Sequence, residues 1–210
     1  MKRTYCVIYL TLFLLFATNC LHAQTYFTGD TLKKRNHQIT TDFLAPMTGN
    51  FTLGLESYMG NEISLYIRLG LIGVGLHENY DKLQGFFVKV QPNFYITPNY
   101  KLENYSVQSN FQGTYFSPVI IVGNFSYNRN NYYNSGEYKI TTGALLINLG
   151  HQFVYKNTFS FNIYGGLGYT AIYSSNGNGR YESYLFSHTT FDADVPIAFD
   201  GGFEIGFLFK

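Results

Sequence analysis

The chain ends in a segment in which apolar residues alternate with small or charged ones. Between Val195 and Phe209, every second residue of "VPIAFDGGFEIGFLFK" is apolar or Gly, while Asp200 and Glu204 fall on the opposite parity. A period of two predicts a β-strand with one apolar face. That face can be the core of a soluble protein or the outside of a membrane barrel, and the alternation alone does not separate the two.

The same alternation recurs in seven earlier segments of the chain. In the cleanest of them, Phe86, Val88 and Val90 share one face and Lys89 and Gln91 lie on the other. The segment that contains "PVIIVG" is apolar on both faces. The eight predicted strands are Ile39–Met47, Phe51–Met59, Ile63–Val74, Phe86–Thr97, Thr114–Tyr127, Lys139–Tyr155, Phe159–Tyr173 and Val195–Phe209.

The connections between these segments alternate in length. "GNE" and "KNT" are short, whereas "HENYDKLQG", "NRNNYYNSGE" and "SSNGNGRYESYLFSHTTFDA" are long and polar. Short turns at one end and long loops at the other are a porin-like pattern, typical of bacterial outer-membrane barrels. The tight "TGN" and the long "PNYKLENYSVQSNFQG" depart from it. We therefore predict an all-β fold, an eight-stranded antiparallel up-and-down transmembrane β-barrel.

The N-terminus has the order of a secretory signal peptide. Lys2 and Arg3 precede an apolar run that is too short to span a membrane as a helix. We expect a signal peptide over residues 1–23, a short periplasmic segment over 24–38 and the barrel over 39–210. Cys20 leaves a lipoprotein signal as an alternative. Both cysteines of the chain lie in this segment, so no disulfide is expected after cleavage.

Composition agrees with a barrel in apolar surroundings. Charged residues make up 13% of the chain, against about 25% in typical soluble domains, while aromatic residues make up 19%. Without Lys2 and Arg3, 12 basic and 13 acidic residues remain, so no nucleic-acid partner is expected. Outside the signal, no apolar run is long enough for a spanning helix, and strands can cross a membrane only as a closed barrel.

A set of charged residues falls on the inward parity of the predicted barrel. An unpaired ion in a narrow lumen costs several kcal/mol, so we expect a buried ion-pair network there, with a gate or ligand site as the alternative. Glu56 would lie diagonal to Arg68, and the carboxylates of the last strand would need Arg68 or Lys89. Eight strands leave no room for a diffusion pore. The predicted lumen network is Asp42, Glu56, Arg68, Lys89, Asp200 and Glu204.

His151 is the one candidate for catalysis, because its parity places it on the lipid side. We interpret it as an interfacial residue near the short turns, and a lipid-modifying outer-membrane enzyme is the alternative. Neither Ser nor a carboxylate stands two residues away from it to form a nucleophile and base. The other histidines lack metal-ligand spacing, and the glycine runs are not followed by a helix. No catalytic residue, metal or cofactor is expected.

A second alternative is a soluble periplasmic carrier of lipocalin type, whose apolar face would point inward and bind an apolar ligand. Its strands would show the same alternation of apolar and polar residues as those of a membrane barrel. Its outer face would then be the set rich in Gly, Tyr and Thr with few charges, which is poor for solubility.

Three stretches carry a family resemblance. "ITTDFLAPMTGNFTLGLESYMGNEISL", "QGTYFSPVIIVGNFSY" and "GALLINLGHQFVYKNTFSFNIYGGLGY" resemble small eight-stranded outer-membrane proteins of Gram-negative bacteria, a family with no known reaction or substrate. "GGFEIGFLF" is similar to the terminal strand that the barrel assembly machinery recognises, except that Lys210 follows the last aromatic. The resemblance implies an assembly signal at Phe203, Ile205, Phe207 and Phe209.

Together these features predict an integral protein of the cell outer membrane with a structural or surface-interaction role. The expected partners are outer-membrane lipid, lipopolysaccharide and the assembly machinery, and the expected state is a monomer.

Overall fold

The computed structural model describes residues 35–74, 81–96, 109–131, 134–174, 187–190 and 196–210. The predicted signal peptide and most of the predicted periplasmic segment lie outside these residues and stay predictions. Among the residues described, no helix is long and apolar enough to cross a membrane.

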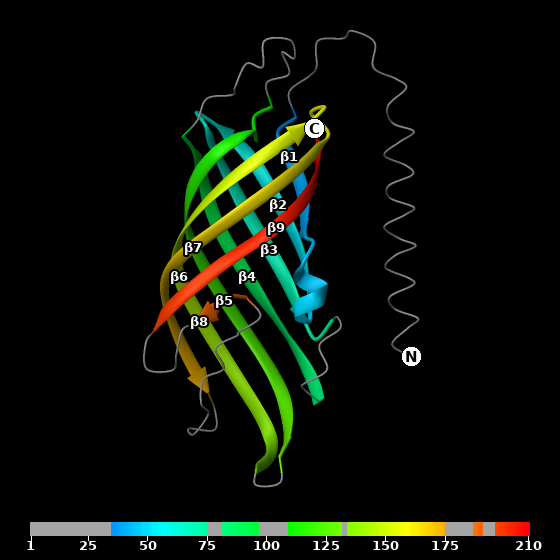
Figure 1. Cartoon of the computed structure of the whole chain (residues 1–210), viewed down its shortest axis with the longest axis vertical. Helices are drawn as coiled ribbons and strands as arrows, with labels where there is room; N and C mark the ends of the chain where they lie inside the picture. The colour runs from blue at the N-terminus through cyan, green and yellow to red at the C-terminus, as the bar shows by residue number, and fades with distance from the viewer. Residues whose placement is uncertain (1–34, 75–80, 97–108, 132–133, 175–186, 191–195) are drawn as a thin grey trace, which may run out of the picture. The chain divides into compact units, whose positions relative to one another are not determined.

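The described residues form one antiparallel sheet that closes on itself (Figure 1). Eight strands make the wall in the order β1-β2-β3-β4-β5-β6-β7-β9, and the pairing of β1 with β9 closes it. The predicted eight-stranded antiparallel up-and-down barrel is confirmed. The strands are β1 (His37–Asp42), β2 (Asn50–Gly60), β3 (Ile63–Ile72), β4 (Asp81–Tyr95), β5 (Gly113–Asn131), β6 (Asn134–Tyr155), β7 (Phe159–Ser174), β8 (Thr189–Thr190) and β9 (Ile197–Phe209).

Two tight turns among the described residues lie at the same end of the barrel, which we call the turn end; the opposite end is the loop end. Asn61 and Glu62 join β2 to β3, and Lys156 and Asn157 occupy the corresponding corner between β6 and β7. All four have positive φ, between 50° and 62°. Left-handed pairs of this kind match the twist of the flanking strands. The register of β2 with β3 shifts by one residue between Tyr58 and Gly60, and beyond that shift residues of the same parity face each other, as they do between β6 and β7.

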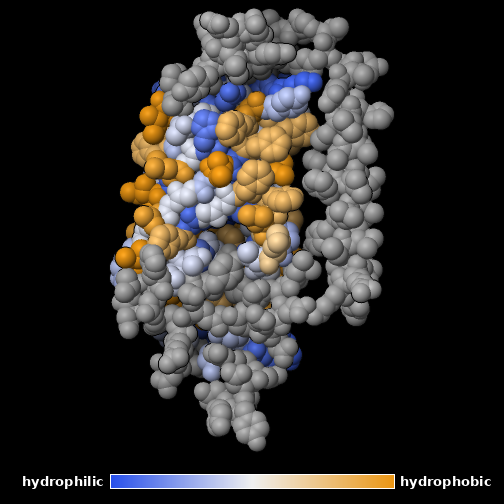
Figure 2. All heavy atoms as spheres, in the orientation of Figure 1, coloured by the Kyte–Doolittle hydropathy of each residue, from blue (hydrophilic) through white to orange (hydrophobic). Residues whose placement is uncertain are grey.

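The apolar face of the strands is the outside of the barrel. Leu53, Ile147 and Ile163 point outward and are 50–64% exposed, whereas their neighbours on the other parity are buried. Apolar side chains gather on much of the wall visible in Figure 2. The inward face predicted for a lipocalin-like carrier is therefore wrong, because the inward side chains along most of the barrel are polar.

The first strand is shorter than predicted. β1 ends at Asp42, and Ala45–Thr48 form the 3-10 helix η2. Pro46 cannot donate to a ladder and Gly49 has φ 83°, which together favour a turn over a continued strand. The apolar alternation of Phe43, Ala45 and Met47 concealed this turn. The connection from β1 to β2 is thus longer than the tight "TGN" expected from the sequence.

The hairpin of β5 and β6 is longer than predicted. Its paired residues continue to Asn131 and Asn134, so most of the expected loop "NRNNYYNSGE" is strand. In Figure 1 this hairpin extends beyond the other strands at the loop end. The polarity reverses where the strands approach this extension: Asn124 and Lys139 face outward, while Tyr127 and Ile140 are buried.

Two apolar clusters lie inside the barrel. The side chains at the loop end are Ile72, Phe87, Phe125, Tyr127 and Ile140. Those deeper along β5, β6 and β9 are Val119, Ile121, Ala144, Leu146 and Ala198. The second cluster explains why "PVIIVG" is apolar on both faces: it has a core on one side and the apolar exterior on the other.

Near the loop end, the ladder of backbone hydrogen bonds that closes the barrel is interrupted between β9 and β2, because β1 is too short to fill the space between them. The pairing of β1 with β9 stops at Asp42 and Glu204. Beyond it, β8 pairs with Ala198 and Phe199 of β9, and the Phe43 N–H donates to the Phe203 carbonyl at 2.9 Å. The chain therefore leaves the sheet at the end of β1 and continues into η2.

Candidate functional site in the lumen

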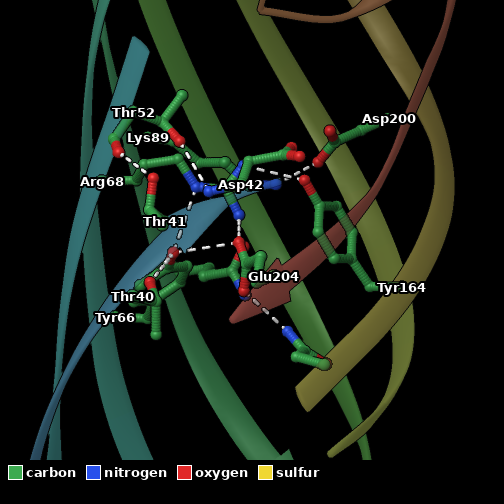
Figure 3. A network of polar contacts seen from close by, with 12 residues as sticks. Thr40, Thr41, Asp42, Thr52, Tyr66, Arg68, Lys89, Tyr164, Asp200 and Glu204 are labelled. Carbon is green, nitrogen blue, oxygen red and sulfur yellow. Dashed lines mark hydrogen bonds and ion pairs between the residues drawn. The ribbon is translucent and has the colours of Figure 1, made fainter. Parts of the chain in front are cut away.

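An arginine at the centre of the lumen joins three strands. Arg68 of β3 forms an ion pair with Glu204 of β9, and both side chains are buried (Figure 3). Its Nε donates to the Tyr66 hydroxyl at 3.1 Å and its Nη1 donates to the Tyr164 hydroxyl at 2.8 Å. Tyr66 donates in turn to Glu204 at 3.0 Å. The guanidinium thus engages one carboxylate and two phenols.

A glycine gives Tyr66 room for these contacts. Gly54 lies opposite Arg68 in the ladder of β2 and β3. A Cβ placed on Gly54 would stand 2.3 Å from the Tyr66 hydroxyl and 2.4 Å from Thr40 Oγ1. Since such distances are far inside contact range, a side chain here would displace the tyrosine. Close packing inside the barrel therefore accounts for at least this glycine.

A second ion pair lies beside the first. Lys89 of β4 pairs with Asp200 of β9, and Asn148 Nδ2 donates to the same carboxylate at 2.7 Å. The ammonium nitrogen of Lys89 is 4.3 Å from the ring centroid of Tyr164, within range of a cation–π contact. Lys89 therefore has a carboxylate and an aromatic face as partners.

Asp42 is held at the edge of this group. The backbone N–H groups of Leu44 and Ala45 bind its carboxylate, the first at 2.9 Å. Its Oδ2 lies 3.9 Å from Arg68 Nη1, which is a longer contact than either pair above. Asp42 also marks the end of β1, so the turn into η2 fixes the side chain where the ladder stops.

Glu56 lies apart from the ion pairs, toward the turn end. The register places Arg68 diagonal to it, as the sequence predicted, because Glu56 is opposite Tyr66 and Gly54 is opposite Arg68. No ion pair joins Glu56 to Arg68 among the described residues, because Arg68 turns to Glu204. The groups that donate to Glu56 are the amide of Gln38, the Ser64 hydroxyl, the amide of Asn93 at 2.7 Å and the Tyr95 hydroxyl at 3.1 Å.

Neutral polar residues complete the lumen, and the sequence reasoning did not single them out. Gln38 accepts from Gln152 at 2.9 Å and from Ser160 at 2.8 Å, and Asn162 donates to Glu204 at 2.8 Å. Inward parity was the signal that could have found them. These side chains link the neighbourhood of Glu56 to that of Glu204.

A histidine near the loop end is buried and uncharged. His188 lies between β7 and β8, with Nε2 2.9 Å from Thr170 Oγ1 and Nδ1 2.9 Å from Ser187 Oγ. Burial lowers the pKa of His188 to about 4, and this exceeds the opposing effect of the Asp200 carboxylate. At neutral pH the imidazole is therefore neutral.

His151 lies on the outside of the barrel, near the turn end. It is half-buried, its Nδ1 is 2.7 Å from Thr114 Oγ1, and its ring centroid is 4.4 Å from that of Phe153. Its ladder partners are Thr114 and Ile163, so neither register neighbour brings a carboxylate. Among the residues that the structure describes, no group of His, Cys, Asp and Glu could hold a metal.

The residues of the predicted assembly signal line the outer side of β9. Phe203 packs edge-on against Phe43 at 6.4 Å between centroids, and Phe207 packs edge-on against Phe159 at 5.8 Å. Phe209 lies 5.6 Å from the ring of His37 at the turn end. Recognition of these residues by the assembly machinery stays a prediction.

No family model and no curated protein matches the chain. Among solved structures, it is similar to the N-terminal β-barrel domain of OprF from Pseudomonas aeruginosa. That similarity has a TM-score of 0.46 and 10% identity, over 84% of this chain and 98% of the other. A likeness this distant carries no argument about function.

Proposed function

We propose that the chain is an integral outer-membrane barrel with a closed lumen, which serves a structural or surface-interaction role. The observation that carries this proposal is the polarity of the wall: large apolar side chains are exposed outside and charged ones are buried inside. A soluble barrel would reverse this arrangement.

The height of the apolar band supports a membrane location. On β6 the outward residues from Leu145 to Tyr155 are apolar apart from His151, and this segment is 11 residues long. A tilted strand needs about 9–11 residues to cross a bilayer. Toward the loop end, Thr141 and Lys139 replace apolar residues on the same face. The polar hairpin extension would then stand in water.

The buried ion pairs favour a structural role for the lumen over conduction. The side chains of Arg68, Lys89, Asp200 and Glu204 are all at most 5% exposed. An eight-stranded barrel has an interior just wide enough for side chains to fill, so a permanent water path beside these residues is not expected.

Fractionation of cells that express the full chain tests the location. We expect the protein in the outer-membrane fraction, with a mobility on a gel that changes when the sample is heated. Recovery in the soluble periplasm would contradict the proposal. In a planar bilayer the purified protein should give no steady conductance, and a stable open channel would contradict the closed lumen.

The lipid-modifying enzyme remains the second candidate function, supported only by the outward position of His151. Replacing His151 with Phe would leave the lipid profile of the expressing cells unchanged if the residue is interfacial. A changed lipopolysaccharide or phospholipid composition relative to the wild-type chain would favour the enzyme.

A further inference from the structure

A cavity of about 180 Å³ lies at the loop end of the lumen, beside the point where β1 leaves the sheet. A water molecule occupies roughly 30 Å³ of the liquid, so the space suits a small molecule. Its walls come from the turn after β1, from β3 and β9, and from the segment before β8. They include Asp42, Thr52, Tyr164, His188, Asp200 and Gly202.

The charges around this cavity do not balance. Asp42, Asp200 and Arg68 line the cavity, and Glu204 and Lys89 lie behind its wall as the ion-pair partners of Arg68 and Asp200. Both cations are engaged, Arg68 with Glu204 and Lys89 with Asp200. His188 adds no charge at neutral pH, because its buried imidazole is neutral. The described part of the lumen wall therefore has one more negative than positive charge here.

The surplus charge belongs to Asp42. Backbone N–H groups hold this carboxylate, and its only ion pair among the described residues is the 3.9 Å contact of Oδ2 with Arg68. The Asp42 side chain is 13% exposed, against 5% or less for the carboxylates of Asp200 and Glu204. Asp42 therefore offers an oxygen to the cavity at a fixed position.

Aromatic walls distinguish among the cations that could enter. Tyr164, Phe87 and Phe199 line the cavity, and the ring of Tyr164 already lies within cation–π range of Lys89. Calcium takes six to eight oxygen ligands, and magnesium requires an octahedral shell. One available carboxylate beside aromatic rings suits an ammonium group with a short carbon chain better.

We propose that this cavity binds a small organic ammonium ion. The ammonium group pairs with Asp42 Oδ2, and the carbon atoms lie against the aromatic wall. This site goes beyond the structural role proposed above and does not depend on it, because it can be measured on the folded barrel alone.

Ethylammonium chloride is the probe, added to the folded barrel of the full chain in detergent at pH 7 and followed by NMR or calorimetry. We expect saturable binding by the wild-type chain and none of ethanol, which has a similar size but no charge. Asp42→Asn keeps the shape of the side chain and removes its charge, so it should weaken binding at least tenfold. Glu56→Gln removes a buried carboxylate at the other end of the lumen and should change the affinity less than twofold.

A second variant keeps the charges and tests the geometry of the site, that is, the space in the cavity and the position of the Asp42 carboxylate. A Cβ on Gly202 would lie 2.8 Å from Asp42 Oδ2 and 2.7 Å from the Tyr164 hydroxyl. Gly202→Ala keeps every charge but narrows the cavity, so it should also weaken ethylammonium binding at least tenfold. Heat-modifiable mobility on a gel would show that each variant is folded.

Three results would overturn the proposal. The first is the absence of saturable binding by the wild-type chain. The second is equal binding by wild type and Asp42→Asn, which would show that ethylammonium binds at a site other than Asp42. The third is calcium binding that depends on Asp42 and excludes ethylammonium, which would assign the cavity to a metal.

Discussion

The lumen stabilises buried carboxylates in two different ways. In the middle of the barrel, Glu204 and Asp200 have cations as partners, Arg68 and Lys89. Toward the turn end, Glu56 is surrounded by hydroxyl and amide donors. Loss of a cation leaves a buried charge without compensation, whereas loss of a neutral donor leaves the remaining hydrogen bonds in place. The two regions should therefore respond differently to substitution.

The largest effect is expected for Arg68→Met. This change removes the cation that joins Glu204, Tyr66 and Tyr164. Breaking a buried pair by removing one partner costs about 3–5 kcal/mol. The measurement is the free energy of unfolding in urea, with the barrel in lipid vesicles.

A double-variant cycle provides the control for Arg68→Met. Glu204→Gln in the same chain removes the charge left behind, so the double variant should be more stable than the sum of the single effects predicts. A loss below about 1 kcal/mol for Arg68→Met, or strict additivity in the cycle, would contradict a net contribution from this pair.

A smaller effect is expected for Glu56→Gln. The amide still accepts from some of the same donors, and the substitution also removes a charge that is costly to bury. We expect a loss of about 1–3 kcal/mol in the same unfolding assay. Ser64→Ala, which removes a single donor, should cost about 1 kcal/mol. If Glu56→Gln costs as much as Arg68→Met, the two regions do not differ as described.

The smallest effect is expected from mild acid, and it should involve the region of the ion pairs. His188 has a pKa of about 4 in the folded chain and an ordinary value of 6.5. Below pH 6.5 the unfolded chain binds a proton that the folded chain does not, so stability falls as the pH falls toward 4. Between pH 7 and pH 6 the loss should be roughly 1 kcal/mol or less.

His188→Gln isolates this contribution to the pH dependence. In the unfolding assay the variant should lose less stability than the wild type between pH 7 and pH 5. If wild type and variant lose the same amount of stability between pH 7 and pH 5, the pH dependence comes from other groups.

The sequence predicted most of the wall because parity reports which face each residue occupies. It placed Asp42, Lys89 and Asp200 on the inward side, and it named Arg68 and Lys89 as the cations that Asp200 and Glu204 would need. It could not assign Arg68 to Glu204 and Lys89 to Asp200, since these residues come from strands that are not neighbours. Alternation within a strand carries no information about distances across a lumen.

The errors in strand length have a different origin. Next to the hairpin extension, polar residues such as Asn124 and Lys139 face out, while Tyr127 and Tyr138 face in. That polarity is the one expected of a strand in water. Along most of the rest of the wall apolar residues face out and polar residues face in, so the same pattern did not identify this segment as strand and it resembled a loop. At the end of β1, the alternation of apolar residues continues through η2. The prediction followed this alternation, although Pro46 and Gly49 favour a turn.

The closing ladder of β1 and β9 has a kinetic consequence. It pairs residues that are 162 to 172 positions apart, from Asp42 with Glu204 to His37 with Phe209. Contacts between such distant positions form slowly, because the entropy of closing the intervening chain must be lost first. Formation of this short ladder is therefore expected to complete folding, and substitutions along it should act mainly on the rate at which the barrel opens.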